Sequence, residues 1–228
     1  MIGRHTLCSL VIVLVAVVPG VMQASAEQYT LEKAGAPPEE LAASVREALA
    51  PEGWRVVGPS GPLCEVWIRK VIPAKREASQ ELGIAFPELA EGTLIGAIRF
   101  LAPTGDYRRA RVKPGVYTMR HMLYPVDGNH MGVAPQRDFV LLSPAGEDSG
   151  AAAMAPSDLL AFSRKASGGG HVSVWRLEAT EAAGEPALVH REEENLWVLH
   201  CAVTLQPEGG TATKKGLALV VVGAAPEA

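Results

Sequence analysis

The stretch between residues 113 and 142 carries the richest set of side chains that could take part in chemistry. Its middle part, residues 125–136, places Asp127, Asn129 and His130 within four positions. Connections of about a dozen residues without regular structure are uncommon in compact domains and often have a function. We therefore predict a contact site for a small molecule, a glycan or a protein, formed by Asp127, Asn129, His130, Arg137 and Asp138.

Two other interpretations of the same stretch stay open. In the structural one, Asp127 and Asn129 bond to their own backbone and the glycines beside them take positive φ. In the chemical one, His121 and His130 supply imidazole and Met131 supplies a thioether, a ligand set that suits copper or zinc. The spacing matches no recognised metal motif. We therefore expect no cofactor, with a copper or zinc protein, or a metal-dependent enzyme, as the alternative.

Motifs for other catalytic chemistry are absent from the sequence. There is no G-x-S-x-G segment for a serine nucleophile. The glycines at 168–170 lack the Lys and Ser/Thr that would complete a phosphate-binding loop. The acidic residues lie singly or in runs, without a recognisable catalytic pair. A non-enzymatic role is therefore favoured.

The elements that must position these residues are mainly strands. Short β-branched and aromatic runs are separated by segments rich in Gly and Pro, without regular alternation of strands and helices. This pattern predicts an all-β fold, a mainly antiparallel β-sandwich. We expect strands at 54–57, 63–71, 94–101, 109–112, 116–124, 138–142, 172–177, 196–205 and 217–222.

Two helices interrupt this pattern. Leu41, Val45 and Leu49 recur at helical spacing after a Pro-Pro-Glu-Glu start, which predicts a short N-terminal helix. A second, inserted helix is expected at 156–165, where Ser157 or Asp158 can cap it. No repeat or domain boundary is visible, so residues 27–228 are predicted to form one domain.

The first 26 residues predict export. Arg4 precedes an uncharged run at 7–18, and Ala24-Ser25-Ala26 has the small-x-small pattern of a cleavage site. The run is too short to span a bilayer, and Cys8 lies at the wrong end of it for a lipid anchor. We expect cleavage after Ala26, release to the periplasm or the exterior, and no membrane span afterwards.

Charge and cysteine content limit which partners are expected and which redox states the cysteines can take. The formal net charge is −4, whereas a nucleic-acid-binding surface needs a clustered excess of basic charge, so a nucleic acid is not expected. Cys64 and Cys201 remain after cleavage and can form a disulfide in an oxidising compartment. Two buried thiols are the alternative.

Several segments resemble a group of uncharacterised exported bacterial proteins. The resemblance rests on residues 65–69, 105–108, 113–120, 127–132 and 137–139. It implies an exported β-rich domain and transfers no catalytic residue. Together with the observations above, it predicts an exported, non-enzymatic binding or envelope-associated protein.

Overall fold

The computed structural model describes residues 28–127, 134–181 and 184–225. The expected signal peptide therefore lies outside the described residues, as do Asn129, His130 and Met131 of the predicted contact and metal sites. Within the described part, strands dominate and two α-helices are present.

The elements follow one another along the chain with few long gaps. They are β1 (Thr30–Ala34), α1 (Ala43–Ala48), β2 (Gly53–Gly58), β3 (Gly61–Ile68), β4 (Ile72–Ala74), β5 (Leu94–Phe100), β6 (Thr104–Gly105), β7 (Arg111–Val112), β8 (Gly115–Leu123), β9 (Asp138–Pro144), α2 (Pro156–Ala166), β10 (Val174–Thr180), β11 (Ala187–Arg191), the 3-10 turn η1 (Glu192–Glu194), β12 (Leu196–Pro207) and β13 (Thr213–Val222).

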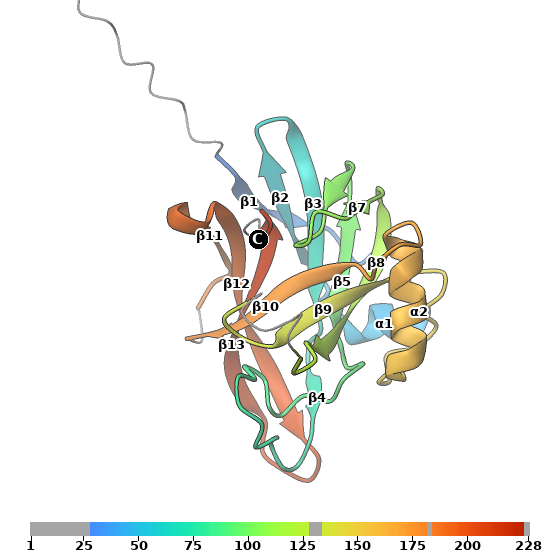
Figure 1. Ribbon diagram of the computed structural model, residues 1–228, viewed down its shortest axis with the longest axis vertical. Coiled ribbons are helices and arrows are strands. Elements are labelled where there is room, and N and C mark those ends of the chain that lie inside the picture. Colours follow the sequence, from blue (N-terminus) through green and yellow to red (C-terminus); the bar gives the residue numbers. More distant parts are fainter. Residues whose placement is uncertain (1–27, 128–133, 182–183, 226–228) are drawn as a thin grey trace, which may run out of the picture.

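One curled sheet organises the fold (Figure 1). Its strand order is β1-β2-β3-β5-β8-β9-β10-β13-β12-β11, and these neighbours are all antiparallel. The short β4 pairs with the end of β12 in parallel, and β6 and β7 form a separate small hairpin. The curl brings the two ends of the strand order close together, because the ring of Tyr29, before β1, lies 5.3 Å from that of Trp197 in β12.

The predicted all-β class and its antiparallel character are confirmed, whereas the sandwich is not. A sandwich needs two sheets packed face to face, and here hydrogen bonding continues from β1 to β11 through one sheet. The two expected helices are confirmed, but each differs in detail. α1 covers only Ala43–Ala48, so Leu41 and Leu49 flank it. Neither Ser157 nor Asp158 caps α2, because Ala155 occupies the N-cap position and Pro156 follows it.

The main core lies inside the curl, and each helix covers a smaller apolar cluster outside it. Leu41, Val45 and Leu49 around α1 pack against Trp67 and neighbouring apolar side chains. Leu159 of α2 packs in a cluster with side chains from β8, β9 and β10. Among the described residues, neither helix has the length and apolar character needed to cross a membrane.

Both cysteines lie in the main core as buried free thiols. The disulfide that the sequence permits is therefore not formed in this structure. Burial raises the pKa of Cys64 and of Cys201 to about 12, and the neighbouring Glu65 adds to the effect at Cys64. A thiol reacts through its thiolate, so both side chains should be inert in the folded protein.

We expect both thiols to resist DTNB at pH 8, because their thiolate fraction is about a thousand times smaller than that of an ordinary cysteine. In denaturant without reductant, two thiols per processed chain should react at once. The measurement is the absorbance of the released dye. A denatured chain that reacts only after a reductant is added would instead reveal a disulfide.

Candidate functional site

Arg120, in the middle of β8, lies at the centre of the most completely bonded side-chain cluster. Its guanidinium is 1% exposed. Nε and Nη2 donate to the two carboxylate oxygens of Asp148 at 2.6 and 2.7 Å. Nη1 donates to the carbonyls of Gly92 and Ala152 at 2.7 Å, and Nη2 donates to the carbonyl of Gly150 at 2.5 Å. A guanidinium has five N–H donors, so all of them are in use.

Asp148 completes this arrangement from the segment that follows β9. Its Oδ2 also accepts a hydrogen bond of 2.5 Å from the Thr118 hydroxyl, and its Oδ1 accepts the backbone N–H of Gly150 at 3.4 Å. Both Asp148 and Arg120 are almost fully buried. Thr118 and Arg120 alternate along β8 and therefore face the same side of the sheet. The pair thus fixes residues 145–155 against the centre of the sheet.

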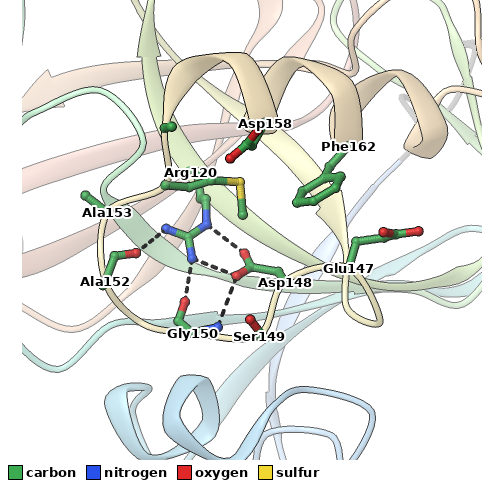
Figure 2. A pocket seen from close by; sticks show the side chains of 11 residues that line it. Arg120, Glu147, Asp148, Ser149, Gly150, Ala152, Ala153, Asp158 and Phe162 are labelled. Atoms are coloured by element: carbon green, nitrogen blue, oxygen red, sulfur yellow. Dashed lines mark hydrogen bonds and ion pairs between the residues drawn. The ribbon is translucent and has the colours of Figure 1, made fainter.

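A cavity of about 370 Å³ opens above this pair, between residues 147–155 and the side of α2 (Figure 2). Ionised groups in its lining comprise the guanidinium of Arg120 and the carboxylates of Glu147, Asp148 and Asp158. Phe162, together with Met154 and nearby alanines, supplies apolar wall. The cavity therefore combines an apolar surface with an excess of negative charge.

The three carboxylates differ in how they are engaged. Asp148 is neutralised by Arg120, and Glu147 bonds Lys165 of α2 at 2.8 Å on the surface. The carboxylate of Asp158 has no hydrogen-bond or ion-pair partner among the described residues, although the backbone N–H of this residue donates to the carbonyl of Ala155 at 3.1 Å. Its place in the first turn of α2 stabilises its negative charge, because the helix dipole is positive there. Asp158 is thus the carboxylate that a ligand can reach.

Lys165 shows how an ammonium group is accommodated beside this cavity. Its Nζ lies 5.4 Å from the centroid of the Phe162 ring while it bonds Glu147. Aromatic faces attract cations through their quadrupole. An aromatic face and a carboxylate therefore already hold one ammonium at the rim.

Two residues proposed from the sequence, His121 and Asp138, lie together in the interior, away from any surface. The side chains are 0% exposed, and Nε2 of His121 lies 2.9 Å from Oδ1 of Asp138. Asp138 also accepts the backbone N–H groups of Ala85 and Phe86 at 2.5 and 3.1 Å. Nδ1 of His121 lies 3.3 Å from the carbonyl of Ala90. Both ring nitrogens thus have oxygen partners within the fold, and the pair holds residues 85–90 to the sheet.

Arg137 has a related role beside Asp138. Its Nε donates to the carbonyl of Tyr124 at 3.0 Å, and its Nη1 bonds Glu81 at 2.7 Å. Asp127 is exposed. The structure thus brings Asp138 and His121 together and keeps Arg137 near the surface, while Asn129, His130 and Met131 lie outside the described residues. Within the described part of the chain, no group of three or more His, Cys, Asp or Glu side chains could hold a metal ion.

The sequence interpretation missed Arg120, Asp148, Asp158 and Phe162 as parts of a site. The sequence does carry a signal for Arg120, because this residue stands in a strand whose other residues are mostly apolar or aromatic. A charge in a buried strand requires a partner. Asp148 stands in a connection rich in Gly, Ala and Ser, without helical or strand periodicity, so its pairing with Arg120 had no local signal.

Comparison of the chain with family models, with curated proteins and with solved structures finds no match. The resemblance to exported bacterial proteins therefore stays a prediction, and the site must be judged on its own geometry.

Replacing Asp148 with Asn should lower the free energy of unfolding by about 3–5 kcal/mol, because it leaves the buried Arg120 without its counter-ion. The matched change Glu147→Gln removes a surface ion pair and should cost less than about 1 kcal/mol. Urea unfolding of the two variants measures both values. Equal, small losses would show that the Arg120–Asp148 pair does not hold the 145–155 segment.

Proposed function

We propose that this protein is an exported binding protein that takes small organic cations into the cavity beside α2. The observation that carries the proposal is the lining of that cavity. Its one guanidinium is completely engaged inside the fold, whereas the carboxylate of Asp158 is unpaired and lines the same cavity as the Phe162 ring.

The charge of the lining favours a cation over an anion. An anionic ligand would need free N–H donors, and every donor of Arg120 already has an acceptor. The same ligand would meet the unpaired carboxylate of Asp158. A cation with a short apolar body avoids both costs, because its charge faces Asp158 and its carbon chain covers Phe162 and Met154.

The size and rigidity of the cavity agree with a small ligand. Small-molecule sites commonly have volumes of several hundred cubic ångströms with mainly apolar walls and a few placed polar groups. The volume of about 370 Å³ falls in this range. Arg120 already fixes the carbonyls of Gly150 and Ala152 in the cavity wall. Ligand binding therefore need not order this part of the wall, which lowers the entropic cost of binding.

Export is the second part of the proposal, and it rests on the sequence of residues 1–26. The position of the first strand supports it. β1 begins at Thr30, and the ring of Tyr29 packs on Trp197. Cleavage after Ala26 thus leaves Tyr29 and all of β1 in the mature chain.

The binding proposal predicts that n-butylammonium shifts the backbone amide resonances of residues 147–162, while butyrate and n-butanol shift them much less. Asp158→Asn should weaken n-butylammonium binding about five-fold, since it removes an ion pair at a partly exposed site. Glu193→Gln, an exposed change in η1, is the matched control and should leave binding unchanged. Equal shifts with butyrate, or an unaffected Asp158→Asn variant, would contradict the proposal.

The export proposal predicts that the full chain, expressed in a bacterium, is recovered from the periplasm or the medium with Glu27 as its first residue. Intact-mass measurement of the purified protein identifies that residue. Recovery of an unprocessed chain from the cytoplasm or the membrane fraction would exclude export.

A further inference from the structure

Strand β12 has an unpaired stretch in the middle of one of its edges. On one side β12 pairs with β13 from Trp197 to Leu205. On the other side it pairs with β11 through Leu196–His200 and with β4 through Leu205–Pro207. Residues 201–204 therefore lie between two strand partners and have none of their own on that side. No backbone hydrogen bond fills the interval within residues 28–127, 134–181 and 184–225.

An opening of about 210 Å³ lies beside this interval. Its lining includes Cys201, Ala202 and Thr204 from β12. Trp54 of β2 and Ile68 of β3 contribute apolar side chains from the other end of the strand order. An extended chain placed along residues 201–204 could therefore direct one apolar side chain into the opening.

The rim of the opening is basic. Lys70, in the lining, is exposed and its ammonium has no partner among the described residues. Lys214 is directly opposite Thr204 in the register of β12 and β13, and it is likewise exposed and unpartnered in that part of the chain. Glu52, the acid in the lining, is bound by Lys33 at 2.9 Å. Within the lining itself, the charged side chains without an ion-pair partner are thus positive.

We propose that residues 201–204 of β12 receive an extended peptide of a partner protein, with alternating apolar and acidic side chains, as an added strand. An open strand edge offers backbone donors and acceptors to such a peptide, and side-chain pockets give the selectivity. Successive side chains of a strand point to opposite faces. Apolar side chains therefore face Trp54 and Ile68, and acidic ones face Lys70 and Lys214.

The interval also sets the length of the bound segment. Four residues of a strand span about 13 Å, and β11 and β4 limit the interval at either end. A peptide with a core of about four residues fits, and flanking residues add little. This site is separate from the α2 cavity, with which it shares no lining residue.

The test uses the full processed chain and the fluorescein-labelled peptide acetyl-TVDVDT-amide, with binding followed by fluorescence anisotropy. We expect the charge-reversed peptide acetyl-TVKVKT-amide to bind at least ten-fold more weakly. Two further peptides carry N-methyl groups on one or the other alternating set of backbone nitrogens. One set should abolish binding and the other should be tolerated, because only one set faces β12.

The chain variant Lys70→Glu should weaken the binding of the acidic peptide about ten-fold and strengthen the binding of the basic peptide. Lys113→Glu, an exposed change between β7 and β8, is the matched control. The proposal is overturned if neither peptide binds, if both N-methylated peptides bind like the parent, or if Lys70→Glu has no more effect than the control. It is also overturned if the chain forms dimers that the peptide cannot compete with, since a second copy would then occupy the edge.

Discussion

The buried pair of Arg120 and Asp148 is the constraint on which the α2 side of the molecule depends. Removing two charges from water is costly, and attraction between them compensates only when the geometry is good and the remaining donors and acceptors are satisfied. Here the guanidinium also bonds carbonyls at both ends of the surrounding chain, at Gly92 before β5 and at Gly150 and Ala152 after β9. One side chain thus ties two segments, more than fifty residues apart, to the centre of β8.

Two other buried carboxylates also hold irregular segments of the chain through hydrogen bonds. Asp138 accepts backbone N–H groups from Ala85 and Phe86, and Asp106 accepts those of Arg108, Ala110 and Val174. Desolvation raises the pKa of Asp106, and its three N–H partners oppose that shift. In each case a buried acid satisfies the backbone of an irregular segment. A sheet with such long connections can keep them ordered because carboxylates replace the missing ladder hydrogen bonds.

Much of this fold could be predicted from the sequence, while the direction of its polar side chains could not. The β-branched runs predicted the long strands, and Pro156 with the apolar spacing after it predicted α2. The short strands β1, β4 and β11 gave weak local signals, because their pairing depends on the curl of the sheet. Asp138 was predicted to belong to the contact site, and His121 to bind a metal in the alternative interpretation, and the structure buries both. Their residue types indicate hydrogen bonding, but only the paths of residues 85–90 and β8 decide that the partners lie inside. Arg120 shows a second limit. Its place in an apolar strand indicates that it needs a partner, but Asp148 stands in a segment without regular structure, so the sequence could not identify it as that partner.

The two proposed sites owe their opposite charges to the same rule. At the α2 cavity the fold uses up its guanidinium and leaves Asp158 unpaired, so the remaining field is negative. At the edge of β12 the fold pairs Glu52 with Lys33 and leaves Lys70 and Lys214 without an acidic partner in the described part of the chain, so these two side chains offer positive charge. What a rigid surface offers a ligand is the charge left after internal pairing, and the net charge of −4 says little about either place. Both sites are near the surface, so a higher ionic strength should weaken the binding of both ligands. The apolar contacts with Phe162 and with Trp54 should persist.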